Sequence, residues 1–221
     1  SGGMLVLGSL VAPSFLASCT SPEATKAAGI AFGMNHFKVS ESDLKKVLAA
    51  ALEKGGDYAD LFFEHTLNNG IQLQDGAVNN AQSNIDFGMG VRVLSGDQTG
   101  YAYVENITLD EMLKAARTAA RIADSNNTNK NVAALTEVKP KGSYYDVQAP
   151  WESFTVKDKM PYLQKLNDKI FSLDKRVRKV QASLGDTTTH VLFCNSEGVT
   201  YYDYRPMVTL GAVCIMEENG Q

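Results

Sequence analysis

Residues 84–123 constrain the fold of this chain more than any other stretch of its sequence. Apolar residues alternate with small or polar residues from Phe87 to Val93, which is the period-two pattern of a β-strand. A turn with Gly96 and Gly100 follows, because glycine accepts backbone angles that other residues resist. Strand-forming residues return at 101–104, so the segment predicts a β-hairpin.

A capped helix is predicted directly after this hairpin. Thr108 and Glu111 have the spacing of a capping box, and two acidic residues lie in the first turn. Apolar residues then recur at helical spacing, namely Leu109, Met112, Leu113, Ala116, Ala120 and Ala123. The stretch specifies local structure well but contains no residue pattern that indicates catalysis.

Similar patterns predict the other elements of the chain. A helix capped by Ser40 ends at Gly55-Gly56. Another helix covers 156–173, and Pro161 favours a start nearer Lys159. Strands are predicted at 58–66, 71–74, 177–184, 190–194, 199–204 and 207–216, with turns at 68–70, 75–76 and 195–198 and a corner at 205–206. This order predicts an α+β fold, a mostly antiparallel sheet of hairpins flanked by about three helices.

The N-terminal segment resembles an export signal. An uncharged apolar run at 4–16 is too short to cross a bilayer but fits the apolar part of a signal peptide. It ends at Leu16-Ala17-Ser18-Cys19, which resembles a bacterial lipobox, so Cys19 is the predicted lipid attachment site. This predicts a lipoprotein on the periplasmic face of a bacterial membrane, tethered only through its lipid. A buried N-terminal helix in a cytoplasmic protein is the alternative.

These features divide the chain into three predicted parts. Residues 1–19 form a signal-peptide remnant, 20–38 a polar linker, and 39–221 the folded domain. The irregular, proline-containing connection at 131–151 suggests that this domain has two lobes, at about 39–126 and 150–221.

Composition excludes several classes of protein. The 221 residues are 44% hydrophobic and 21% charged, which is ordinary for a folded domain. The net charge of −4 disfavours nucleic-acid binding. Three cysteines are too few for a disulfide scaffold. Cys194 and Cys214 could pair if their strands are neighbours, but small buried apolar residues are the preferred interpretation.

The search for a metal or catalytic site yields no residue to assign. His36, His65 and His190 are far apart in the sequence, and we expect each to be an isolated structural or surface residue. His190 and Cys194 would lie about 13 Å apart along one strand, too far to share an ion. No Gly-x-Ser-x-Gly motif occurs, and Gly88-Met89-Gly90 lacks the rest of a dinucleotide fingerprint.

Two further groups of residues remain open in meaning. Acidic pairs such as Asp57 with Asp60 and Glu217 with Glu218 are typical of solvated surfaces. The tyrosines beside Arg205, at positions 201, 202 and 204, fit either a peptide groove or ordinary packing on a sheet.

Several blocks of the sequence, in order, resemble the N-terminal domain of TldD/PmbA proteins. They are GDYADLFFE at 56–64, GMGVRVLSG at 88–96, TGYAY at 99–103, AARTAARIA at 115–123, RVRKVQASL at 176–184 and VCIMEENG at 213–220. The last two favour the TldD branch, and the resemblance covers about 40–221.

This resemblance implies a zinc-dependent peptidase, some of whose relatives were first described as modulators of DNA gyrase. Members assemble as dimers and cut unfolded or extended peptides inside a closed cavity. We therefore expect a homodimer or heterodimer with a TldD/PmbA-like subunit, a peptide substrate, and zinc in the full-length protein. The family's zinc ligands and catalytic glutamate lie in a His-Glu-x-x-x-His motif of the C-terminal domain. This sequence lacks that motif, so the resemblance assigns no catalytic or metal-binding residue to it.

Two hypotheses follow. In the first, the chain is the scaffold and substrate-channel domain of such a peptidase, and an edge strand holds substrate by strand addition. The segments at 71–74 and 101–104 are the candidates for that edge. In the second, the chain is a non-enzymatic exported lipoprotein that serves as a binding or assembly module.

Overall fold

The computed structural model describes residues 29–123, 131–139, 145, 147 and 149–219. These residues form four α-helices and a six-stranded sheet, which confirms the predicted α+β class. The helices are α1 (Ile30–Phe37), α2 (Glu41–Leu52), α3 (Leu109–Ile122) and α4 (Val156–Leu173), and a 3-10 turn, η1, covers Trp151–Ser153. The strands are β1 (Tyr58–Gln74), β2 (Ala77–Ser95), β3 (Gln98–Val104), β4 (Thr136–Glu137), β5 (Val177–Asn195) and β6 (Val199–Met216).

The sheet has the strand order β3-β2-β1-β5-β6-β4. All neighbouring strands are antiparallel except β4, which runs parallel to β6. The hairpins predicted at 75–76 and 195–198 are present, and Asp75 and Gly76 both have positive φ angles, 51° and 84°. This antiparallel order follows from the short turns between consecutive strands.

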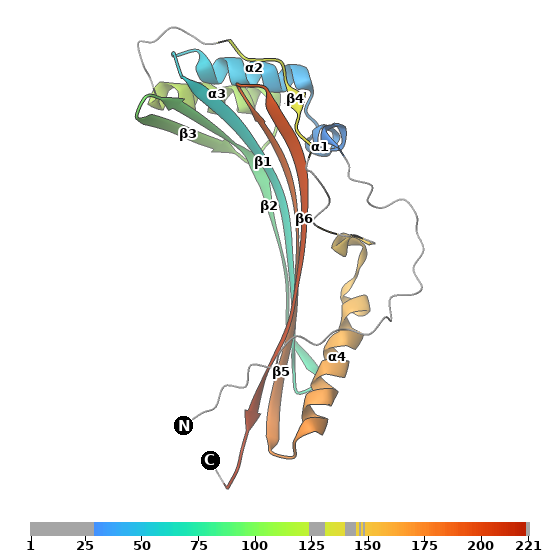
Figure 1. Ribbon diagram of the computed structural model, residues 1–221. Coiled ribbons are helices and arrows are strands. Elements are labelled where there is room, and N and C mark those ends of the chain that lie inside the picture. Colours follow the sequence, from blue (N-terminus) through green and yellow to red (C-terminus); the bar gives the residue numbers. More distant parts are fainter. Residues whose placement is uncertain (1–28, 124–130, 140–144, 146, 148, 220–221) are drawn as a thin grey trace.

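Four long strands run the length of the molecule as one curved sheet (Figure 1). The predictions of a turn at 68–70 and a corner at 205–206 are wrong, because β1 and β6 continue through these positions without a break. Thr187 Oγ1 donates to Asn68 Oδ1 at 2.8 Å, so this side chain bonds across the sheet rather than forming a turn. Pro206 lies on β6 beyond the short pairing with β4, where a missing N–H is tolerated.

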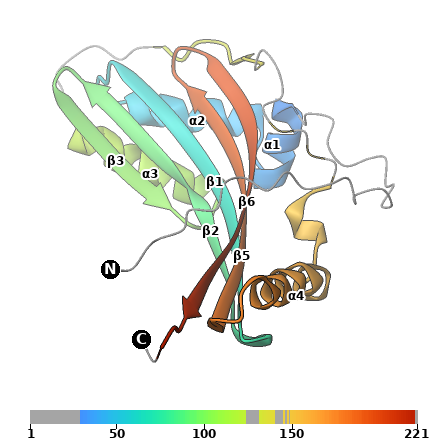
Figure 2. The same cartoon turned by 60° about the horizontal axis from the view of Figure 1, so that its bottom comes forward.

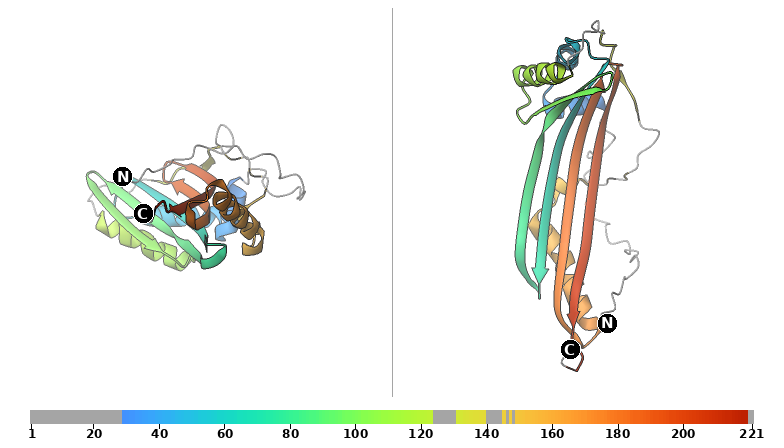
Figure 3. Two further views of the ribbon diagram at one scale, coloured as in Figure 1. Left: turned by 90° about the horizontal axis from the view of Figure 1, so that it is seen from below. Right: turned by 90° about the vertical axis from the view of Figure 1, so that its left-hand side faces the viewer.

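All the α-helices lie on the convex face of the sheet, and its concave face carries none of them (Figures 1 and 3). Two separate apolar cores form on the convex face. The larger packs α1, α2 and α3 against one end of the sheet, and the smaller packs α4 against the other, around Leu73 and Leu163. Figure 2 shows the twisted sheet running between these two ends.

Residues 30–37 were assigned to a linker by sequence, and here the prediction is wrong. They form α1, whose Phe37 is 1% exposed within the larger core. Gly33 and Asn35 have low helix propensity, so contacts with the sheet rather than local preference stabilise this helix.

The other helices begin where the sequence indicates. Ser40 caps α2 with a full capping box, as predicted. Thr108 accepts from Glu111 N at 3.4 Å at the start of α3, but the Glu111 side chain pairs with Lys114 instead of completing the box. α4 starts at Val156, so Pro161 lies inside the helix and does not delay its beginning to Lys159.

Candidate functional site

The three histidines of this chain lie together on the convex face. Their wide separation in the sequence had predicted isolated residues, and that prediction is wrong. His36 comes from α1, His65 from β1 and His190 from β5. The register of the sheet places His65 directly opposite His190. Because directly paired residues in antiparallel strands project from the same face, their rings meet above the sheet, where α1 adds the third.

The rings are in direct contact. His36 Nε2 and His65 Nδ1 are 2.8 Å apart, and the His36 ring stacks on that of His190 with centroids 4.1 Å apart. Tyr202 on β6 bonds to His190 Nδ1 at 2.7 Å, and Glu152 of η1 lies 3.3 Å from His190 Nε2. We call these five residues, His36, His65, His190, Glu152 and Tyr202, the histidine cluster.

Burial changes the acid–base behaviour of the cluster. The pKa of His36 falls to about 4, because burial disfavours its charged form and neighbouring His190 and His65 add repulsion. Burial and His190 also lower the pKa of His65. Burial opposes ionisation of Glu152, but hydrogen bonds and the attraction of His190 together outweigh it, so the pKa of this carboxyl is lowered. The imidazoles of His36 and His65 are therefore neutral near pH 7.

The cluster does not fit a zinc ion. The stacked rings of His36 and His190 are 22° from parallel, so their nitrogen lone pairs do not converge on one point. Tetrahedral zinc needs ligand atoms at about 2.0–2.3 Å that do converge. Among the residues that the structure describes, no group of three or more His, Cys, Asp or Glu side chains is arranged to hold a metal. The arrangement can instead bind, share and release protons.

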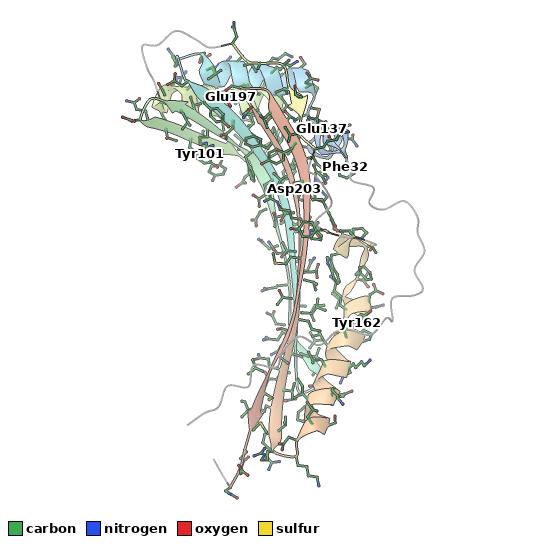
Figure 4. All side chains as sticks on the ribbon, in the orientation of Figure 1. Phe32, Tyr101, Glu137, Tyr162, Glu197 and Asp203 are labelled. Carbon is green, nitrogen blue, oxygen red and sulfur yellow. The ribbon has the colours of Figure 1, made fainter. Side chains whose placement is uncertain are left out.

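A second candidate surface lies on the concave face beside β3. It is a shallow depression of about 580 Å³ whose lining includes Phe62, Glu64, Tyr101, Tyr103 and Glu105, and we call these five residues the concave patch. Tyr101 and Tyr103 are 59% and 67% exposed, which is unusual for side chains of this size. Figure 4 shows Tyr101 on the side of the sheet opposite Phe32 and Tyr162.

Gly88 and Gly90 belong to the lining of this depression. A Cβ on Gly90 would lie 2.7 Å from the Tyr101 hydroxyl, so the tyrosine ring folds over the glycine. A Cβ on Gly88 would meet the Val104 carbonyl oxygen at 2.6 Å. These glycines therefore permit β3 and its aromatic side chains to approach β2.

A polar depression of about 440 Å³ continues along the middle of the sheet. Amide and hydroxyl side chains dominate its lining, which includes Asn68, Gln82, Asn84, Thr187 and Thr209. Such groups can both donate and accept hydrogen bonds, so they can contact a peptide backbone without reading its sequence.

The remaining residues singled out by sequence are distributed over the fold. Tyr202 and Tyr204 join the convex face near His190, whereas Tyr201 stacks on Phe193 with centroids 5.0 Å apart. The tyrosines therefore do not form one groove. Arg205 pairs with Asp203 at 2.6 Å.

The acidic pairs prove to be ion-pair or hydrogen-bond partners. Asp60 binds Arg92 at 2.6 Å, while Asp57 accepts from the Gly96 amide at 2.8 Å. Glu217 and Glu218 pair with Arg178 and Arg176 at the end of the sheet.

The two described cysteines are free and cannot pair within the chain. Cys194 on β5 lies opposite Thr200, whereas Cys214 on β6 lies opposite Val180. Val180 and Cys194 are fourteen positions apart along β5. That separation corresponds to roughly 45 Å along a strand. Cys194 is buried as expected, but Cys214 is exposed, which corrects the prediction for that residue.

Cys19 lies outside the described residues. Within the described part of the chain, no helix is both long and apolar enough to span a membrane.

Comparison with known proteins identifies the family. The model for PmbA/TldA metallopeptidase domain 1 matches residues 59–123, and the model for the central domain of the same metallopeptidases matches residues 149–221. The chain belongs to the TldD/PmbA family. His65 lies in the first matched domain and His190 in the second, so the histidine cluster of this TldD/PmbA protein joins the two.

Relatives and solved structures agree with this assignment. The metalloprotease TldD homologs of Haemophilus influenzae and Buchnera aphidicola subsp. Schizaphis graminum are 34% and 30% identical to this chain in sequence. Both alignments cover 75% of this chain. The chain spans about a third of their length, 34% in both cases. A candidate modulator of DNA gyrase from Thermotoga maritima shares the fold with a TM-score of 0.64 at 18% identity. TldE from Thermococcus kodakarensis gives 0.57 at 15% identity, and each alignment covers 81% of this chain and 40% of the other.

Proposed function

We propose that this chain is the part of a TldD-type peptidase that holds an extended peptide substrate on the concave face of its sheet. The observation that carries this proposal is that no described helix covers that face, which presents the exposed tyrosines of the concave patch beside an amide-rich depression. Aromatic rings bind apolar side chains of a peptide, and the amides bind its backbone. Membership of a metallopeptidase family supports a peptide as the ligand.

Strand addition can contribute only at the edges of the sheet. Of the two segments that sequence analysis considered, 71–74 lies in β1, which is paired on both sides by β2 and β5. The segment 101–104 lies in β3, which is an outer strand of the described sheet. β3 therefore remains the candidate edge for main-chain pairing with a peptide.

Cleavage itself belongs, in this proposal, to a longer protein that contains the chain. The family resemblance assigns zinc to a His-Glu-x-x-x-His motif that this sequence lacks, and the histidine cluster does not fit zinc. Assembly with a second TldD/PmbA-like subunit would close a cavity over the concave face. Attachment of lipid at Cys19, on the periplasmic face of a membrane, is a further part of the proposal, and the intact mass of the membrane-bound protein tests it.

Cross-linking at matched tyrosines tests the proposal directly. A photoreactive benzoylphenylalanine replaces Tyr101 on the concave face or Tyr162 on the convex face, which are 59% and 55% exposed. The probe is a reduced, carboxymethylated polypeptide that stays unfolded. We expect cross-links from position 101 and few from position 162. Equal cross-linking from both positions would show that the concave face is not a peptide site.

Affinity provides a second measurement of the same proposal. Tyr101→Ala and Tyr103→Ala should each weaken binding of the labelled unfolded polypeptide about 5- to 10-fold, as expected for loss of about 1 kcal/mol of aromatic contact. Tyr162→Ala is the control and should leave the anisotropy titration unchanged. Unchanged affinity in both concave-face variants would contradict the proposal.

A further inference from the structure

The histidine cluster fastens α1 to the sheet. Helix α1 is only eight residues long and is too short to be stable alone in water. Its contacts with the sheet include Phe37 in the larger core, Gly33 against the Tyr202 ring, and His36 between His65 and His190. At its N-terminus, Ile30 N donates to Glu137 Oε1 at 3.1 Å. The contact through His36 is the one that protons can alter.

We propose that the histidine cluster is a proton-sensitive latch, which holds α1 on the sheet while the imidazoles of His36 and His65 are neutral and weakens that docking on acidification. In the neutral cluster one imidazole N–H donates to the other ring across the 2.8 Å contact between His36 Nε2 and His65 Nδ1. When both rings are protonated, both nitrogens are donors and the hydrogen bond is lost. The two cations would then lie 5.0 Å apart between ring centroids, with repulsion added to the lost bond.

Glu152 compensates these charges only in part: its carboxylate favours the charged forms of His36 and His65, but burial and the neighbouring histidines outweigh it. Among the described residues, β2 contributes the uncharged Phe87 ring, β6 contributes Tyr202 and Tyr204, and η1 contributes Glu152. Burial raises the pKa of both tyrosines, so they are neutral at acid and neutral pH. Glu137 on β4 already accepts from the first turn of α1.

Glu152 is the acidic group that touches the rings, and it contacts His190 rather than His36. The 3.3 Å contact between Glu152 Oε1 and His190 Nε2 holds η1 against β5 and does not involve α1. His36 stacks on the His190 ring, and the described residues give it no carboxylate in hydrogen-bond contact. Protonation of His36 therefore weakens the attachment of α1 rather than that of η1.

The size of the effect follows from the difference between docked and released His36. Its pKa is about 4 when docked, against the ordinary value of 6.5 when exposed to water. Proton linkage then increases the opening equilibrium of α1 about 30-fold between pH 8 and pH 5 from this residue alone. His65 contributes in the same direction.

Amide hydrogen exchange of the 221-residue chain tests the latch. Exchange is measured at pH 8 and pH 5 and corrected for the intrinsic rate at each pH. We expect protection in α1 to fall at least 10-fold at pH 5, while protection in α3, which contains no histidine, changes less than 3-fold. An equal loss in both helices, or no loss in α1, would overturn the proposal.

Two variants separate the latch from general acid sensitivity. His36→Gln keeps a hydrogen-bonding side chain that does not titrate, and Asn35→Gln changes the exposed neighbouring position on the same helix. We expect His36→Gln to lose most of the pH dependence in α1 and Asn35→Gln to retain it. If His36→Gln leaves α1 unprotected at every pH, NMR titration of the three wild-type histidines replaces it. His36 must then titrate well below pH 6, and a value near 6.5 would overturn the proposal.

Discussion

Lys159 of α4 and Asp186 of β5 form a buried ion pair, with Lys159 Nζ 2.6 Å from Asp186 Oδ2 and side chains only 6% and 2% exposed. Asn69 Nδ2 also donates to Asp186 Oδ1 at 3.0 Å, so the carboxylate is bonded from both the helix and the neighbouring strand. This network joins α4 to the middle of the sheet, beside the smaller core. It fixes one end of the surface that carries the polar depression, to which Asn69 and Asp186 also contribute.

Removing the lysine should therefore destabilise the protein strongly. Lys159→Met leaves the Asp186 charge buried without its cation, which typically costs about 3–5 kcal/mol in the free energy of unfolding. The exposed Lys157, on the same helix, provides the control, and Lys157→Met should change stability by less than about 0.5 kcal/mol. Urea unfolding followed by circular dichroism measures both variants. Equal stability of the two variants would show that the buried pair contributes nothing.

Gly100 should be irreplaceable, because α3 packs directly on the backbone of β3. A Cβ at this position would lie 1.9 Å from the Ala119 carbonyl oxygen. Gly100→Ala must push the helix outward, so we expect a loss of about 3 kcal/mol or more in the free energy of unfolding. Gly211→Ala is the control, since the nearest atom to its Cβ would be Ser183 Oγ at 3.8 Å. Similar unfolding midpoints for the two variants would contradict this account of the packing.

The sequence predicted hairpins, caps and core faces because these depend on neighbouring residues. Gly76, Ser40 and the alternation around Met89 are local signals, and each has its expected role in the structure. The length of the strands was not predictable in this way. Asn68, Asn69 and Gly70 have the composition of a turn, but their side chains and backbone pair across β1, β2 and β5 in the folded sheet.

The histidine cluster was missed for a related reason. His65 and His190 meet because β1 and β5 pair in one particular register. The two residues are 125 positions apart in the chain, so this register depends on tertiary packing and not on local sequence. Side chains two positions apart on a strand lie on the same face of the sheet. His65 lies two positions from buried Phe63, and His190 lies two positions from buried Leu192. This spacing places both rings on the core face, but it does not pair the strands or predict α1.

The cysteines should differ sharply in reactivity. Burial raises the pKa of Cys194 to about 12, so its thiol is neither ionised nor accessible at pH 8. Cys214 is exposed on β6. In a Cys19→Ser variant, which removes the third thiol, we expect one rapid reaction with Ellman's reagent in the native state and a second only in denaturant. Cys214→Ser should abolish the rapid reaction, and two rapid reactions in the Cys19→Ser protein would contradict the burial of Cys194.

Global stability should fall between pH 7.5 and pH 5 because of the histidine cluster. Folding lowers the pKa of His36 to about 4 and also lowers that of His65, so the unfolded state binds protons more readily. The stability that the neutral rings contribute is complete above pH 6.5 and is lost as the pH falls from 6.5 toward 4. Since both rings are partly solvated, we expect a loss of about 1–2 kcal/mol by pH 5.

Urea unfolding at pH 7.5 and 5.0 should show this loss in the wild type and little of it in His36→Gln/His65→Gln. The hydrogen bond from Arg176 lowers the pKa of Asp174 to about 2, so this carboxylate stays ionised throughout the range. An identical loss in the double variant would place the acid sensitivity outside the cluster.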